Sequence, residues 1–196
     1  MERLSLSFSE RMAGKVGSRN LSVDLVVKIP DLYKFFQNPE HEGEVTGTIN
    51  LDGKTFSIDE GQGTFSLFSP DKTDHRLKHL KYFLSFRMNG IPYHLDGRKA
   101  IKDDEGADAI KDITTLYVTL SPIPKSGAVD EEGVIYFDSK DFLDLFRSIV
   151  VEGSNKLVQI GAKATFIGFC FGQMFSTYIV GKLTELLEEP KTTTGR

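Results

Sequence analysis

The sequence predicts a mainly β protein: an antiparallel β-barrel or β-sandwich of about eight to ten strands, with two C-terminal helices packed on it. Apolar and polar residues alternate through residues 80–88, which is the period of a half-buried strand. The dipeptides Asn-Gly or Asp-Gly occur at residues 52–53, 89–90 and 96–97, next to alternating segments, and they suit the tight turns of hairpins. Beyond residue 137 the apolar period becomes that of helices.

The other strands are predicted from the same alternation. They are expected at residues 4–8, 21–27, 45–51, 56–58, 63–68, 91–95, 113–120 and 134–137. A short helix is predicted at residues 30–36, where Pro30 precedes aromatic residues at helical spacing. Because short turns join most strands, an antiparallel order is favoured over a parallel sheet.

The pattern of the last third of the sequence predicts a helical hairpin at residues 138–187. Together with a β-rich part at residues 1–137, this hairpin is expected to form one domain of residues 1–187. Its first helix would begin at Asp138 or Ser139, and its second would run from Asn155 to about Leu187. The stripe expected to dock the second helix on the sheet recurs every seven residues and consists of Leu157, Ala164, Phe171 and Tyr178. Residues 188–196 are expected to be a disordered tail.

Residues 164–181 carry no charge and lie between Lys163 and Lys182, close to the lower length limit of a membrane-spanning helix. Their glycines and hydroxyl side chains make them less apolar than a typical span. We therefore expect a core helix rather than a span, with peripheral membrane contact as an open alternative.

Composition narrows the class of partner. The chain has 15 Phe and no Trp, which indicates an interior of phenyl rings, either a wide core or an apolar pocket. Its net charge of −4 offers no general source of the counterion release that drives nucleic-acid binding. Cys170 is the single cysteine and the start of the chain lacks the pattern of a secretory signal, so a cytoplasmic location is expected.

No sequence motif indicates catalysis, a metal or a cofactor. The four histidines do not have the spacing of a metal site, and the acidic residues at 103–108 lack the pattern of a calcium loop. We predict no metal, no cofactor and a protein that is not an enzyme by itself. The alternative is a small lipid-directed hydrolase or isomerase, which would require polar groups to converge in a pocket.

The candidate ligand contacts are mainly aromatic side chains of the predicted meander, with two polar residues. They are Tyr82, Phe86, Tyr93, His94, Asp112 and Phe171. Asp112 directly precedes a strand, where a carboxylate can accept backbone hydrogen bonds. His94 falls on the face of its strand opposite Tyr93 and Leu95, which predicts a solvated histidine.

Residues 8–14, Phe-Ser-Glu-Arg-Met-Ala-Gly, resemble the FTE-x-M-x-G opening of a domain found with cholesterol-oxidase-like glucose/methanol/choline oxidoreductases. The resemblance continues through residues 82–90, 96–99 and 112–117 to a closing FG-x-x-F helix at residues 169–178. It implies an accessory module beside a flavoenzyme that acts on sterols or other bulky lipids, and the flavin-binding half is not in this chain. The expected function is to bind a bulky apolar molecule, such as a sterol or long acyl chain, or to present it to such an oxidoreductase, and the alternative is a purely structural docking role.

Overall fold

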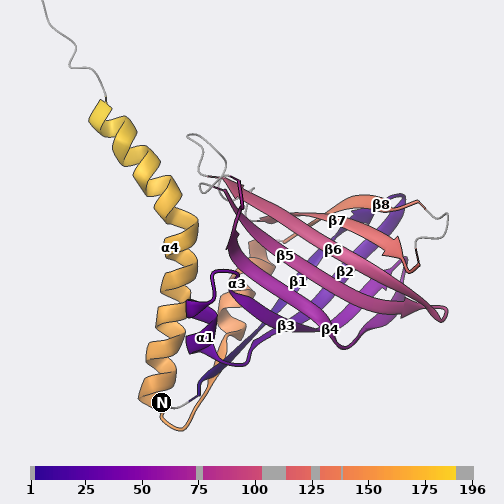
Figure 1. Ribbon diagram of the computed structural model, residues 1–196, viewed down its shortest axis with the longest axis horizontal. Coiled ribbons are helices and arrows are strands. Elements are labelled where there is room, and N and C mark those ends of the chain that lie inside the picture. The colour runs from indigo at the N-terminus through magenta and orange to yellow at the C-terminus, as the bar shows by residue number, and fades with distance from the viewer. Residues whose placement is uncertain (1–2, 74–76, 103–113, 125–128, 138, 189–196) are drawn as a thin grey trace, which may run out of the picture.

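Eight strands form a closed antiparallel barrel in the computed structural model, which describes residues 3–73, 77–102, 114–124, 129–137 and 139–188 (Figure 1). The strands are β1 Ser5–Val16, β2 Arg19–Ile29, β3 Glu42–Leu51, β4 Lys54–Pro70, β5 Leu77–Met88, β6 Ile91–Lys102, β7 Thr115–Pro122 and β8 Glu131–Tyr136. Each strand pairs with its neighbours in sequence, and β8 closes the ring on residues 13–16 of β1. The predicted antiparallel fold is confirmed, as a barrel rather than a sandwich.

A ninth strand and the helices lie at one end of this barrel. β9, Val150–Glu152, pairs with residues 5–7 of β1. The described helices are α1 Leu32–Gln37, α3 Ser139–Ser148 and α4 Lys156–Glu188. Figure 1 shows α4 across the end of the barrel, with α1 and α3 between them, and the last turns of α4 running on beyond the barrel. The predicted helical hairpin is therefore interrupted by a strand.

Two of the three predicted hairpin turns are confirmed. Asn89 and Gly90 have φ angles of 53° and 81°, and Asp52 and Gly53 have φ angles of 49° and 82°, as tight turns with two left-handed residues require. The third prediction was wrong, because Gly97 lies inside β6 and pairs with both β5 and β7. A Cβ at this position would lie 2.8 Å from Leu116 Cδ2. Close packing inside the barrel, rather than a turn, thus explains this glycine.

The strand boundaries differ from the prediction in the fourth strand. Residues 56–58 and 63–68 belong to one strand, β4, whose register with β5 shifts between Ile58 and Gly63. Gly61 lies in this irregular stretch with a φ of 68°. The alternation of side chains breaks at such a bulge, so one bent strand looks like two short ones in the sequence.

α4 docks through a different face from the one predicted. Leu157 is 79% exposed and Phe171 is 39% exposed, and Ala164 is also exposed, whereas Phe166 is 1% exposed. The ring of Phe166 lies 5.9 Å from that of Phe8 in β1 and 6.0 Å from that of Phe35 in α1. This helix has apolar residues on adjacent faces, and the aromatic rings at the barrel end select the one that packs. The side chain of Tyr178 lies outside the described residues.

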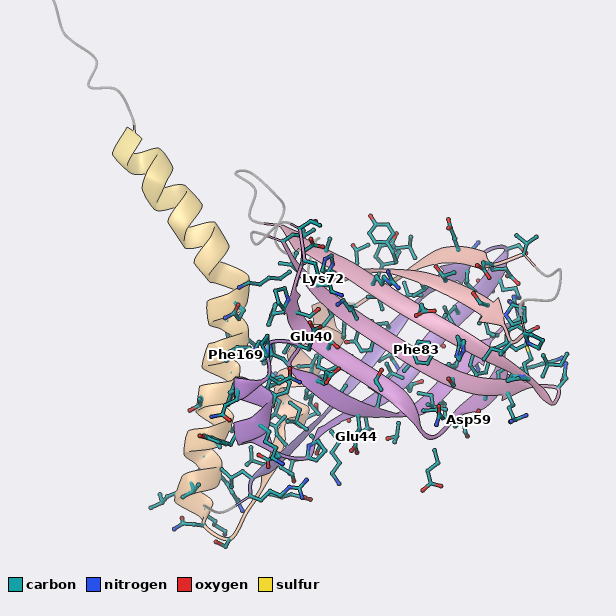
Figure 2. The ribbon with its side chains drawn as sticks, in the orientation of Figure 1. Glu40, Glu44, Asp59, Lys72, Phe83 and Phe169 are labelled. Atoms are coloured by element: carbon teal, nitrogen blue, oxygen red, sulfur yellow. The ribbon has the colours of Figure 1, made fainter. Side chains whose placement is uncertain are left out.

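Phe169 completes this contact, and Figure 2 shows it where α4 meets the rest of the domain. Its ring lies 5.3 Å from Phe36 and 4.9 Å from His41.

Within the described part of the chain, no helix combines the length and the apolar character needed to cross a membrane.

Candidate ligand-binding site

A cavity of about 80 Å³ lies inside the barrel at the end that α4 covers. The side chains around it come from β1, β4, β5 and β6, from α3 and α4, and from Phe137 after β8. The apolar ones are Phe8, Phe65, Leu67, Phe68, Leu80, Ile101, Phe137, Leu145, Phe146 and Phe166. Four others, Glu10, Tyr82, Lys99 and Cys170, bring polar or ionisable atoms to this apolar space.

Glu10 enters the barrel because of the alternation of β1. Leu6, Phe8, Glu10 and Met12 share the inward face of this strand, and Glu10 is only 5% exposed. Tyr82 takes the corresponding inward position on β5 and is 3% exposed. Its hydroxyl donates a hydrogen bond to Glu10 Oε2 over 2.6 Å. Since β1 and β5 are four strands apart in a ring of eight, this bond crosses the interior of the barrel.

Burial changes the protonation of this pair. Removal from water raises the pKa of Glu10 from 4.5 to about 7, although the hydrogen bond from Tyr82 partly opposes the rise. Burial, followed by the nearby Glu10 charge, also raises the pKa of the Tyr82 phenol well above its ordinary value. Near neutral pH the phenol is therefore a hydrogen-bond donor, while the carboxyl group exists in both its neutral and its ionised form.

Lys99 reaches the same cavity from β6, the strand next to β5. It follows Leu95 and Gly97 on the inward face, pairs with Leu80, and is 3% exposed. A lysine on this face is unusual, because lysines are almost never fully buried unless they are paired. Glu10, Tyr82 and Lys99 thus place a carboxyl, a phenol and an amine around one apolar space.

Cys170 contributes to the wall rather than to the chemistry of the cavity. Burial, followed by the nearby Glu10 charge, raises the pKa of its thiol to about 12. The thiolate is the nucleophilic form of cysteine, so this residue is unreactive in the folded protein.

The wall beside Glu10 is formed by α3. Residues 5–7 of β1 pair with β9 and residues 13–16 pair with β8, and between these two ladders the Ser9 amide donates to Ser148 Oγ over 2.9 Å. A groove of about 400 Å³ lies on the outer side, with Arg11 and Asp24 along its edge. Glu10 and Leu145 border both the groove and the cavity. β1 and α3 therefore lie between the cavity and this groove.

The predicted ligand contacts do not come together at this cavity. Tyr82 lines it, whereas Phe86 and Tyr93 stack on each other, with ring centroids 5.9 Å apart, further along the barrel. Phe171 is partly exposed on α4 and stacks at 5.2 Å on Phe146. Asp112 lies outside the described residues.

His94 lies on the outer wall of the barrel, on the face predicted for it. It is half-buried there, with Nδ1 2.9 Å from Ser85 Oγ and its ring 4.5 Å from that of Phe83, which Figure 2 labels on this wall. It faces away from the cavity, so its partners give it a structural role.

Two residues of the site, Glu10 and Lys99, were not predicted as ligand contacts. Each is a charged residue at an inward position of an alternating strand, between Phe8 and Met12 in one case and between Gly97 and Ile101 in the other. A charge on the apolar face of a strand is the signal that could have identified them.

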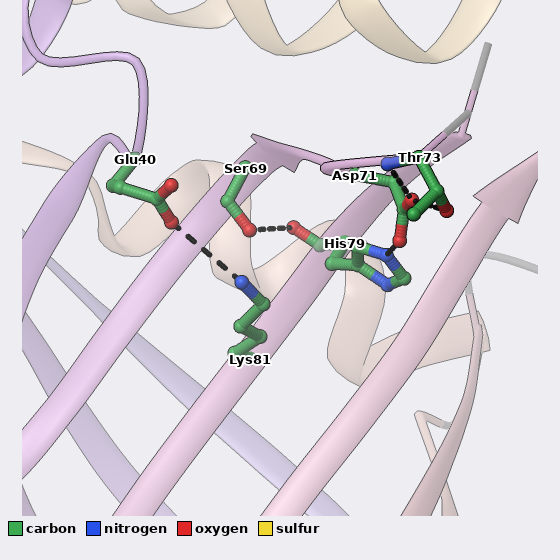
Figure 3. A network of polar contacts seen from close by, with 6 residues as sticks. All are labelled: Glu40, Ser69, Asp71, Thr73, His79 and Lys81. Carbon is green, nitrogen blue, oxygen red and sulfur yellow. Dashed lines mark hydrogen bonds and ion pairs between the residues drawn. The ribbon is translucent and has the colours of Figure 1, made fainter. Parts of the chain in front are cut away.

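A second polar cluster, drawn in Figure 3, stabilises the ends of β4 and β5 near the surface. His79 Nε2 lies 2.8 Å from Asp71 Oδ2, and the other carboxylate oxygen accepts hydrogen bonds from the Thr73 amide and hydroxyl at 2.7 and 2.6 Å. Lys81 lies 3.6 Å from Glu40. His75 is outside the described residues, and those that are described contain no group of side chains that could hold a metal ion.

Comparison with known proteins adds no assignment: no family model, curated protein or solved structure matches this chain. The cavity and its polar groups therefore carry the functional argument.

Proposed function

We propose that the protein binds a slim, mostly apolar molecule with one polar end in the cavity beneath α4. The observation that carries this proposal is the buried hydrogen bond between Tyr82 and Glu10 within walls of phenyl and aliphatic side chains. Burying a carboxyl group costs free energy that an apolar residue at the same position would avoid. Ligand sites combine such apolar walls with a few converging polar groups, and eight-stranded barrels can hold one small ligand.

The volume of the cavity favours a linear chain over a sterol. About 80 Å³ is well below the roughly 300–1,000 Å³ of pockets that enclose drug-sized molecules. A single acyl chain is narrow enough to pass between aromatic rings, whereas a fused ring system would require α3 or α4 to move. The polar end would meet Glu10 and Tyr82, and the chain would contact rings such as Phe8 and Phe65.

Ligand retention tests this proposal. We expect organic extraction of the purified protein, followed by mass spectrometry, to release a molecule of this class. The matched variants are Cys170→Ala, which keeps the cavity open, and Cys170→Phe, which fills it; Leu67→Phe is a second filling variant, because overpacking costs about 1–3 kcal/mol and one variant could fail to fold. Ligand retained by Cys170→Ala and lost from a folded filling variant supports the proposal. No extracted molecule and no binding of added octanol or octanoate would refute it.

Catalysis is a second candidate function, because a carboxyl group with a pKa of about 7 beside a phenol suits proton transfer. Polar groups do converge in the cavity, as an isomerase of lipid substrates would require. Incubation of a β,γ-unsaturated alkyl ketone with the wild-type protein and with Glu10→Gln tests this. Conversion to the conjugated isomer by the wild-type protein alone would support it, and equal conversion by both would refute it.

The partnership with a glucose/methanol/choline-type oxidoreductase stays a proposal that rests on the sequence resemblance, which includes residues 8–14. The cytoplasmic location is a separate proposal, which rests on the single cysteine and on the pattern of the first residues. Glu10 belongs to residues 8–14, so the resemblance and the cavity involve the same residue. The test is lipid oxidation by a purified flavin oxidoreductase encoded near this protein, with and without the protein added. An unchanged rate, together with no complex in gel filtration, would remove the partnership.

A further inference from the structure

We infer that the polar end of the ligand is a hydroxyl group, which bonds Glu10 Oε1 both when Glu10 is neutral and when it is ionised. This inference rests on the proposed function and names the chemistry of the polar end. It follows from the hydrogen bond that Glu10 already makes and from those that its second oxygen can still make.

Glu10 uses one of its two carboxyl oxygens within the described part of the chain. Tyr82 donates to Oε2 over 2.6 Å, and no second donor among the described residues bonds this carboxyl group. Oε1 is not among the side-chain atoms that are fully enclosed without a partner, of which His41 Nδ1 is an example, so it keeps some exposed surface. Because Glu10 borders both the cavity and the outer groove, a small polar group can reach this oxygen.

The hydrogen bond that Oε1 offers depends on the protonation of Glu10. When Glu10 is neutral, its O–H donates to an acceptor, and when Glu10 is ionised, Oε1 accepts from a donor. Both forms are populated near neutral pH, because burial raises the pKa of Glu10 to about 7. A ligand that only accepts therefore matches the neutral form alone, and one that only donates matches the ionised form alone.

A hydroxyl group is the smallest polar end that matches both forms, because it has one donor and two acceptor lone pairs on a single atom. An ether or a ketone only accepts, so it would leave an ionised Oε1 unpaired in apolar surroundings, which costs free energy. A carboxylate also only accepts, and its charge would lie beside that of ionised Glu10. A chain that ends in a hydroxyl, such as a fatty alcohol, is therefore the class that the site favours.

The other ionisable groups of the cavity do not decide the state of Glu10. They are Tyr82 on β5, Lys99 on β6 and Cys170 on α4, while the lining residues of β4 and α3 are apolar. The phenol and the thiol stay neutral because burial raises the pKa of each, and Lys99 has an interaction partner of its own. Burial raises the pKa of Glu10 and the Tyr82 hydrogen bond opposes part of the rise.

On the groove side the charged groups are paired with one another. Arg11 Nε on β1 lies 2.6 Å from Asp24 Oδ1 on β2, and on α3 Arg147 Nη1 lies 2.9 Å from Asp144 Oδ1. About half or more of each of these side chains is exposed, so water and salt screen their charges. The proton on Glu10, rather than a neighbouring charge, therefore decides which bond Oε1 offers.

The experiment compares octan-1-ol with its isomer 1-methoxyheptane, which only accepts, and with octanoate, by calorimetry between about pH 5.5 and 8.5. The affinity of octan-1-ol should rise by up to about tenfold as Glu10 ionises, because a hydrogen bond to a charged group is stronger than one to a neutral group. The affinity of the ether should fall by up to about tenfold, because it loses its donor. Octanoate should bind more weakly than octan-1-ol at pH 8.5.

Glu10→Gln separates the two chemistries, because its amide both donates and accepts and does not titrate. This variant should bind the alcohol and the ether with affinities that do not change with pH. The control Glu44→Gln, at an exposed position of β3, should leave both wild-type profiles unchanged.

A second variant gives an independent readout if Glu10→Gln does not fold. The Tyr82 hydrogen bond lowers the pKa of Glu10, so Tyr82→Phe should move both pH transitions to higher pH. Alcohol and ether profiles that run in parallel in the wild-type protein, or octanoate as the tightest ligand at pH 8.5, would overturn the inference and leave the proposed function standing. Binding of none of the three probes would refute both.

Discussion

The two halves of the barrel interior share three strands, β1, β5 and β6, and differ in what fills them. Away from α4, apolar side chains leave a void of only about 10 Å³. This filled half includes Met12, Leu84, Leu95, Leu116, Val118 and Ile135. Beneath α4 the void is about 80 Å³, and the carboxyl group of Glu10, the phenol of Tyr82 and the amine of Lys99 line it. The half away from α4 is therefore packed as a core that supports the fold, whereas the half beneath α4 has the space and the polar groups that a ligand would need.

The two halves meet within one inward step along β1 and along β5. Met12 in the filled half and Glu10 in the cavity are successive inward residues of β1. On β5, Leu84 lies in the filled half, and the next inward residue, Tyr82, borders both voids. Protein interiors normally reach the packing density of organic crystals with apolar side chains. The cavity half departs from this rule on both counts, volume and polarity, which is what a binding site requires and a purely structural core does not.

The largest expected difference between the halves is the cost of removing a leucine. Leu84→Ala should lower the free energy of unfolding by about 3–4 kcal/mol, because it opens a cavity in tightly packed surroundings. Leu80→Ala, on the same strand and face but half-buried beside an existing cavity, should cost about 2 kcal/mol. Urea unfolding of both variants measures the difference, and equal losses would mean that the cavity half is packed as tightly as the other.

The second effect is the pH dependence that Glu10 gives to stability. The pKa of Glu10 is 4.5 in the unfolded reference and about 7 in the folded protein, so its stabilising contribution is fully present below pH 4.5 and is lost as the pH rises through 7. The loss is about 3 kcal/mol. Glu10→Gln should therefore have little effect near pH 4 and stabilise the protein, relative to the wild type, near pH 8.

The difference in unfolding free energy between the wild type and Glu10→Gln isolates the contribution of Glu10, because the other carboxyl groups titrate in both proteins. Thermal or urea unfolding at about pH 4, 6 and 8 is sufficient. Glu44→Gln, at an exposed position, is the control and should track the wild type throughout. If the stability difference between the wild type and Glu10→Gln stays constant with pH, the carboxyl group of Glu10 is not buried as described.

Local patterns in the sequence were sufficient to predict the class of fold. The period of two in segments such as residues 80–88 and the turns at Asp52 and Asn89 depend on neighbouring residues only, and both were predicted correctly. Closure into a barrel was not decided, because it depends on the pairing of β1 with β8 from opposite ends of the β-rich part. β9 was missed for the same reason, since a strand of three residues exists only through its partner β1.

The site was mostly beyond sequence-based prediction. The candidates Phe86 and Tyr93 stack on each other outside the cavity, because the alternating pattern does not show how far along the barrel each residue lies. The hydrogen bond between Glu10 and Tyr82 joins residues 72 positions apart and requires the ring of strands to be closed. The charges at Glu10 and Lys99 were visible in the sequence, and their inward positions were the overlooked signal.

The smallest expected effect concerns the face of α4 that covers the cavity half. Phe171→Asp should cost only about 1 kcal/mol, because this side chain is 39% exposed and loses mainly its stacking on Phe146. Phe166→Asp is the matched variant five residues earlier, on the face of α4 that packs. It would bury a charge among Phe8 and Phe35, and helix docking or folding should fail. Urea unfolding reports the stability of each variant, and the labelling rate of Cys170, a buried residue of α4 itself, reports docking. Wild-type-like labelling of Phe171→Asp, with fast labelling of Phe166→Asp, would show that α4 closes the cavity through the Phe166 face. Similar losses in both variants would instead show that the predicted stripe through Phe171 holds the helix.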